Sequence, residues 1–265
     1  MSTIEQGEFT TSDGVDLVWR RAGSGPPMVL VHGLTDDLTS WDPLVDAFAA
    51  RHTVVRYDQR GHGASGRQGP YELERLAADL LELVAGLGLD TPVLVGHSLG
   101  GLVVTAAAAV SEVAAVVDVD QPLVLGDMVA LVSAIADDLR SPERFRPTLA
   151  AVFAGMVGAG GDELRARVDE LVAAADPEVV LGVWSPLLDS SPDELAARID
   201  DVLSGVRVPY LAVHGSDPGP GYATWLAERV PGARLEVRDG VGHFPHLVDP
   251  AGFVELVEDF LAAGA

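Results

Sequence analysis

Residues 92–101 read Pro-Val-Leu-Val-Gly-His-Ser-Leu-Gly-Gly. The apolar run from Pro92 to Val95 predicts a buried strand, and the alanine-rich stretch from Leu99 to Val110 predicts a helix directly after it. Between them lies a Gly-x-Ser-x-Gly motif centred on Ser98. A serine on so tight a strand-to-helix turn needs neighbours without side chains, and Gly96 and Gly100 meet that need. In this setting the motif predicts a serine hydroxyl raised above a sheet, beside a helix N-terminus.

Strands and helices alternate on both sides of this turn. A hairpin is predicted around Ser12-Asp13-Gly14, and short apolar runs predict buried strands at 27–31, 53–57, 113–119, 208–213 and 233–237. From about residue 121 to residue 205 the alternation stops, and helices are predicted at 125–139, 144–157, 162–175 and 192–202. We therefore predict the α/β class, with a mostly parallel central sheet and helices on both faces. Residues 1–120 and 206–265 would form this core, and 121–205 a helical cap inserted into it.

Composition excludes several classes of function. Acidic residues outnumber basic ones 40 to 17, for a formal charge of −23, which would repel nucleic acid and anionic membrane surfaces. There are no cysteines, so disulfides, thiolate chemistry and cysteine-based zinc sites are excluded. No set of His, Asp and Glu has metal-ligand spacing, and we expect neither a metal nor another cofactor. With no secretory pattern at the N-terminus and no apolar run long enough for a bilayer, we expect a cytoplasmic protein.

Three further motifs follow predicted strands in a fixed order. Val31-His32-Gly33-Leu34 follows the first buried strand, Asp-Gln-Arg-Gly-His-Gly-Ala-Ser at 58–65 follows the next, and Gly242-His243-Phe244-Pro245 follows the last. Together with the serine motif, these segments resemble the α/β-hydrolase superfamily, in the branch that carries a helical cap. The resemblance covers nearly the whole chain outside the cap. It implies the α/β-hydrolase fold and a serine hydrolase activity.

The resemblance also implies roles for particular residues. Ser98 would be the nucleophile and His243 its general base. The backbone N–H groups of Leu34 and Leu99 would form the oxyanion hole, which binds the negative oxygen of the reaction intermediate. His246 is a rival for the base, but Gly242 directly precedes His243 and matches the Gly-His pair of the family.

The carboxylate partner of the histidine is the least determined part of the site. We expect Asp217, which follows Gly215 by two positions, although the acid of the family more often follows that glycine by three. Asp118 and Asp120 remain alternatives, because some members carry the acid one strand earlier. Asp58 and Arg60 are expected to form a buried structural ion pair rather than to take part in catalysis.

The expected function is hydrolysis of a small to medium apolar ester or lactone through an acyl-enzyme, with that small molecule as partner and neither nucleic acid nor a membrane. Apolar cap residues would shape the substrate pocket. Carbon–carbon bond hydrolase, proline-type aminopeptidase and cofactor-free haloperoxidase activities remain alternatives, although the chain has no Asn, on which the carbon–carbon bond hydrolases usually depend. A receptor-like scaffold that binds a ligand with little turnover is the alternative from another class.

Overall fold

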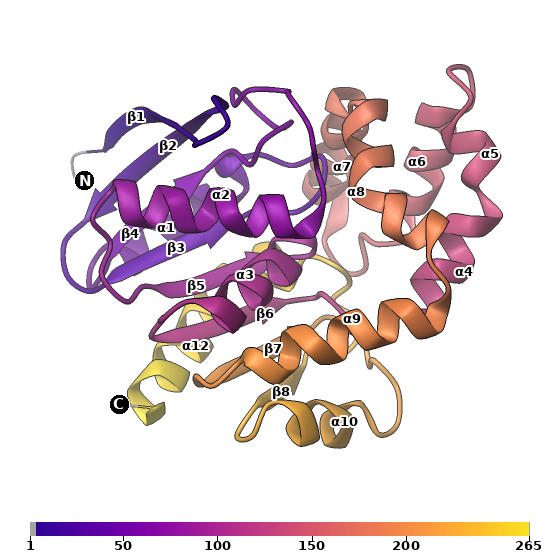
Figure 1. Ribbon diagram of the computed structural model, residues 1–265. Coiled ribbons are helices and arrows are strands. Elements are labelled where there is room, and N and C mark those ends of the chain that lie inside the picture. Colours follow the sequence, from indigo (N-terminus) through magenta and orange to yellow (C-terminus); the bar gives the residue numbers. More distant parts are fainter. Residues whose placement is uncertain (1–3, 265) are drawn as a thin grey trace.

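The computed structural model describes residues 4–264, whose strands form one eight-stranded sheet in the order β1-β2-β4-β3-β5-β6-β7-β8 (Figure 1). The first three strands in this order pair antiparallel and all later neighbours pair parallel. The predicted fold class, a mostly parallel sheet of the α/β type, is confirmed. The strands are β1 (Glu5–Thr10), β2 (Asp16–Gly23), β3 (Pro27–Val31), β4 (Thr53–Tyr57), β5 (Val93–His97), β6 (Ala115–Val119), β7 (Tyr210–His214) and β8 (Arg234–Val237).

Alternating residues of the central strands build two separate apolar layers. Met28 and Leu30 of β3 face a layer completed by α1 and α12, whereas Val29 and Val31 face the layer completed by α2, α3, α9 and α10. Because both faces are covered, the strands read as continuous apolar runs rather than as alternating ones. The elements outside the cap region are η1 (Leu38–Trp41), α1 (Asp42–Phe48), α2 (Leu73–Gly86), α3 (Leu99–Val110), α9 (Pro192–Gly205), α10 (Tyr222–Arg229), α11 (Pro245–Val248) and α12 (Pro250–Gly264).

A group of helices lies beyond one end of the strands of the sheet (Figure 1). These helices are α4 (Gly126–Ala134), α5 (Ala136–Leu139), α6 (Phe145–Ala154), α7 (Gly161–Ala174) and α8 (Pro177–Asp189). The single helix predicted over 125–139 is two helices that break at Ile135. Helix α8 was not predicted, although Asp176 caps its start through the N–H of Glu178 and a proline follows. No single helix of the described chain is long and apolar enough to cross a bilayer, whereas α7 and α8 together, bent by 95°, meet the length and composition required.

Helix α9 does not group with these five. It packs along α3 and also contacts α10, and its Gly205 lies so close to α3 that an added Cβ would stand 2.5 Å from the carbonyl oxygen of Ala109. The predicted cap of residues 121–205 includes this helix. We propose instead that the cap consists of α4–α8 and that α9 belongs to the core.

A chain of hydrogen bonds joins β6, β7 and α3 inside the core. The hydroxyl of Tyr210 bonds the carboxyl of Asp118 at 3.1 Å and the hydroxyl of Thr105 at 2.9 Å, and Thr105 donates to the carbonyl oxygen of Gly101 at 2.7 Å. Tyr210 donates to Asp118, and that hydrogen bond on its own would stabilise the carboxylate. Burial outweighs it and, with a smaller contribution from the charge of Asp120, raises the pKa of Asp118 well above its ordinary value. Folding therefore favours the protonated form of Asp118.

Replacing Asp118 by Asn should therefore preserve the fold, because the amide oxygen can accept the Tyr210 hydroxyl as the carboxyl does, and the amide brings no charge into the core. In the wild type the unfolded chain loses this proton above about pH 4, whereas the folded chain keeps it. The folded state then binds more protons than the unfolded state, so the free energy of unfolding of the wild type falls as pH rises. The stability of Asp118→Asn relative to the wild type should therefore increase between pH 4 and pH 7. Urea unfolding across this range measures the difference, with the exposed Asp90→Asn as the matched control. An advantage that shrinks with rising pH would show that Asp118 is ionised.

Candidate active site

Ser98 sits between β5 and α3 in a strained conformation. Its φ is 52° and its ψ −122°, a region that residues with a side chain rarely adopt. A Cβ added to Gly96 would stand 2.1 Å from the carbonyl oxygen of Gly100. A Cβ added to Gly100 would stand 2.2 Å from the carbonyl oxygen of Val31. Both positions therefore require glycine, as the sequence motif predicts. The turn places Ser98 at the start of α3, where the first amides have no partner within the helix.

His243 lies in the loop between β8 and α11, and its backbone is held from two sides. Its N–H donates to the carbonyl oxygen of Met156 at 2.8 Å, and its own carbonyl oxygen accepts from Nε2 of His97 at 2.7 Å. The rings of His97 and His243 are 4.7 Å apart. Because His97 directly precedes Ser98, these contacts bring the histidine loop against the serine turn.

Asp120 is the carboxylate that meets this histidine. Its Oδ2 lies 2.6 Å from Nδ1 of His243, and its Oδ1 accepts the N–H of Gly215 at 2.7 Å. Burial on its own would raise the pKa of Asp120, but the hydrogen bond and charge of His243, with the Gly215 N–H, outweigh it and lower the pKa. An ionised Asp120 accepts a hydrogen bond from Nδ1–H, so the neutral ring carries its free lone pair on Nε2 of His243.

The prediction that Asp217 contacts His243 is wrong, because the structure places Asp120 there. Asp217 is exposed, and its Oδ1 accepts the N–H of Gly219 at 2.9 Å. The loop after β7 approaches the site through Gly215 instead, which packs so closely on the histidine loop that a Cβ would stand 1.8 Å from the Gly242 carbonyl oxygen. The chain then turns outward before Asp217. Asp120, one of the two alternatives, is the first residue after β6, and that position at the carboxyl edge of the sheet was the available signal.

The remaining histidines of the motifs are buried inside the core. His246 is fully buried, and desolvation lowers its pKa to about 3. His246 is therefore neutral near pH 7, and it packs against Trp41 and His97. His62 is likewise buried, with its pKa lowered to about 3 by desolvation and by the charge of His32. This environment makes His246 an unfavourable rival to His243.

The expected ion pair between Asp58 and Arg60 is wrong. Arg60 bonds Asp79 and Asp13 instead, at 2.6 Å and 2.9 Å. Asp58 accepts backbone N–H groups of two loops, those of Leu38 and Ala64, each at 2.8 Å. Asp58 thus joins the loop after β3 to the loop after β4. Both residues are structural, as the sequence predicts, but with different partners.

The loop after β3 lies directly against the serine turn. A Cβ at Gly33 would stand 3.2 Å from Cβ of Ser98. His32 fixes the backbone here: its Nδ1 donates to the Gly33 carbonyl oxygen at 2.7 Å, and its Nε2 accepts the N–H of Gln59 at 3.0 Å. Leu34 follows immediately, and Leu99 is the first residue of α3. These positions are compatible with the predicted oxyanion donors, whose roles remain proposals.

A family model described as the alpha/beta hydrolase family matches residues 28–256. The chain belongs to the alpha/beta hydrolase family. An uncharacterised protein of Mycobacterium tuberculosis H37Rv is 29% identical, over 96% of this chain and 80% of its own length. The enol-lactonase from Burkholderia xenovorans LB400 shares the fold at 24% identity and a TM-score of 0.80, over 97% of this chain and 100% of its own. Est816, an N-acyl homoserine lactone degrading enzyme, is 25% identical with a TM-score of 0.80, over 96% and 100%. These similarities support hydrolase activity.

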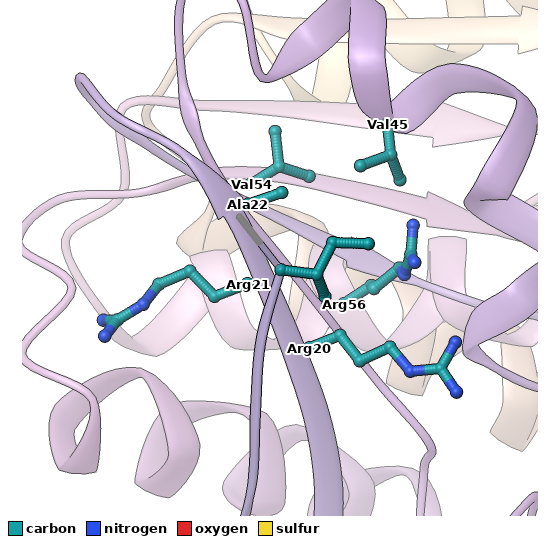
Figure 2. A pocket seen from close by; sticks show the side chains of 7 residues that line it. Arg20, Arg21, Ala22, Val45, Val54 and Arg56 are labelled. Atoms are coloured by element: carbon teal, nitrogen blue, oxygen red, sulfur yellow. The ribbon is translucent and has the colours of Figure 1, made fainter. Parts of the chain in front are cut away.

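Elsewhere on this hydrolase, a hollow at the outer edge of the sheet is no rival site. Figure 2 shows it between β2, β4 and α1, with the Arg21 side chain directed away from those of Arg20 and Arg56. It has no room for a water-sized group. Arg56 already bonds Asp42 at 2.7 Å. The hollow therefore carries neither a ligand space nor a converging set of charges.

The Asp120–His243 contact can be tested without an activity assay. In the wild-type hydrolase, Nδ1 of His243 should carry the proton and give a strongly downfield N–H resonance. Asp120→Ala should abolish that resonance and mix the two tautomers, because the only acceptor that the structure places at Nδ1 among residues 4–264 is gone. Nitrogen-15 histidine NMR measures both signals. Asp217→Ala is the matched control, and a spectrum that changes there but not in Asp120→Ala would reverse the assignment.

Proposed function

We propose that this hydrolase cleaves carboxylic esters or lactones through an acyl-enzyme, with Ser98 as nucleophile, His243 as general base and Asp120 as the carboxylate that orients the base. The observation that carries the proposal is the 2.6 Å contact between Asp120 and His243, on a loop that packs against the strained serine turn. A histidine with a purely structural role needs neither an ionised carboxylate partner nor a strained serine turn beside it. Ser98, His243 and Asp120 would therefore act as nucleophile, base and orienting acid.

The chemistry follows from the proton positions. Nε2 of His243 takes the hydroxyl proton as Oγ of Ser98 attacks the acyl carbon. The carbonyl oxygen becomes an oxyanion, which the amides of Leu34 and Leu99 would bind. His243 then returns the proton to the leaving alkoxide, and the acyl–oxygen bond breaks. Water, activated by the same histidine, releases the acid and restores Ser98.

Support for an apolar ester or lactone comes from two sources. The comparisons include an enol-lactonase and an N-acyl homoserine lactone degrading enzyme, whose substrates are cyclic esters. The proposed cap has an apolar interior: Phe145, Phe153 and Trp184 are buried in the main apolar cluster. Met128 and Met156 are only partly buried beside that cluster, and their flexible side chains suit them to contact an apolar substrate.

Ser98→Ala should abolish hydrolysis of activated esters and lactones while leaving the fold intact. Loss of the attacking hydroxyl removes the covalent route and should cost several orders of magnitude in kcat. The assay is a panel of activated esters of graded acyl length with lactones included, and circular dichroism checks the fold. Labelling by a fluorophosphonate probe, present in the wild type and absent in the variant, separates an enzyme from a ligand-binding scaffold. A variant that keeps a tenth of wild-type turnover would refute the role of Ser98.

Asp120→Asn should lower kcat by more than about a hundredfold, because the ring loses the carboxylate that holds its tautomer and stabilises the imidazolium. Asp217→Asn should stay within about twofold of the wild type, as an exposed surface change. Steady-state kinetics on the same ester measures both. Equal losses, or a larger loss at Asp217, would return the acid to the loop after β7.

A further inference from the structure

The loop that follows β3 is strained and buried. We call residues 34–37 the oxyanion loop, because Leu34 supplies one proposed oxyanion donor. Thr35 has a φ of 66°, a conformation that a β-branched residue adopts only under constraint from its surroundings. Asp36 is 2% exposed. A strained segment next to the reacting atoms needs an interaction that keeps it in place.

Arg167 of the cap helix α7 provides that interaction. Its Nη2 bonds Oδ1 of Asp36 and lies 3.5 Å from Oδ1 of Asp37. The same Oδ1 of Asp36 accepts the N–H of Asp37 at 2.8 Å. The guanidinium, the Asp36 carboxylate and the loop backbone are thus joined in one chain of contacts. This chain crosses from the cap to the core.

The two charges of this pair support each other. Burial raises the pKa of Asp36, and the guanidinium of Arg167 opposes that shift, so loss of Arg167 would raise this pKa further. Burial opposes the charge of Arg167 too, but the carboxylate of Asp36 and its hydrogen bond more than compensate and raise the pKa of Arg167. Removing one partner of such a pair leaves a buried charge without compensation, which forces the segment to rearrange or to take up a proton.

Side-chain packing around the oxyanion loop does not replace the ion pair between Arg167 and Asp36. A cavity of ≈ 100 Å³ lies between the oxyanion loop, residues 61–63 of the core and residues 174–180 of the cap. Within the described chain, Oδ2 of Asp36 and Oγ1 of Thr35 have no hydrogen-bond partner. Side chains that border a cavity lose contacts on that side. The loop is therefore held here by a directional ion pair more than by close packing.

We propose that Arg167 is a positioning residue for the oxyanion hole: through Asp36 it keeps the Leu34 amide directed at the oxygen of the substrate. The inference rests on the proposed ester or lactone hydrolysis, and it goes beyond it by making the cap part of the catalytic apparatus. A second contact acts in the same direction, because the cap carbonyl of Met156 accepts the N–H of His243 at 2.8 Å. The cap thus holds one loop on each side of Ser98.

The test uses Arg167→Gln, Arg167→Lys and a control on the same helix. Arg165 faces solvent and pairs with the exposed Asp162 at 3.1 Å, so Arg165→Gln removes a charge without touching the loop. Because the oxyanion forms during the reaction and is absent from the bound substrate, Arg167→Gln should lower kcat about 10- to 100-fold and change KM about twofold at most. Arg167→Lys should recover part of the loss, and Arg165→Gln should match the wild type.

Hydrogen exchange gives a readout that does not depend on activity. Arg167→Gln should speed amide exchange in residues 34–37 while the strands of the core keep wild-type protection, and Arg165→Gln should change neither. If the wild type neither hydrolyses esters nor labels with the fluorophosphonate, the proposed function fails, and exchange still decides whether Arg167 holds the loop. If Arg167→Gln keeps wild-type kcat, or loses it together with protection of the whole core, the positioning role is refuted. A double variant with Asp36→Asn should be no slower than Arg167→Gln alone, since both act through one contact.

Discussion

The active site depends on one geometric constraint, the turn at Ser98. A positive φ at a residue with a side chain is tolerated because Gly96 and Gly100 let α3 pass within contact distance of β3 and β5. That close approach fixes the direction of α3 and places its first amides beside the serine hydroxyl. The loops after β3, β6 and β8 then converge on this point, since the carboxyl ends of parallel strands share one edge of the sheet.

Two aspartates on one strand show how local environment separates chemical roles. Asp118 lies within β6, where burial outweighs the hydrogen bond donated by Tyr210 and favours the neutral acid. Asp120 lies two residues later, past the end of the strand, where His243 and the N–H of Gly215 favour the carboxylate. Both side chains have the same chemistry. Their different depth and partners decide which of them can stabilise an imidazolium.

The cap contributes more than a cover over the site. Arg167 reaches the loop after β3 and the carbonyl of Met156 reaches the loop after β8. Beside the contact with Met156, the two backbones approach closely: a Cβ added to Gly158 would stand 2.6 Å from Cα of Gly242. Such contacts tie the position of the cap to the geometry of the reacting groups. Within the proposed function, a change in cap sequence would alter turnover as well as substrate preference.

The sequence by itself determined the fold class, the strand-to-helix turn at Ser98 and the histidine motif at His243, because each depends on local patterns: apolar periodicity, paired glycines and the order of motifs along the chain. It favoured Asp217 over Asp120 as the partner of His243, and it did not find α8, the packing of α9 along α3, or the pairing of Arg167 with Asp36. Each of these depends on which loop turns inward and which helix finds space on the sheet. Such choices are made by packing between segments far apart in sequence, as where Gly215 packs on Gly242 and Asp217 is left exposed, and no local pattern records them.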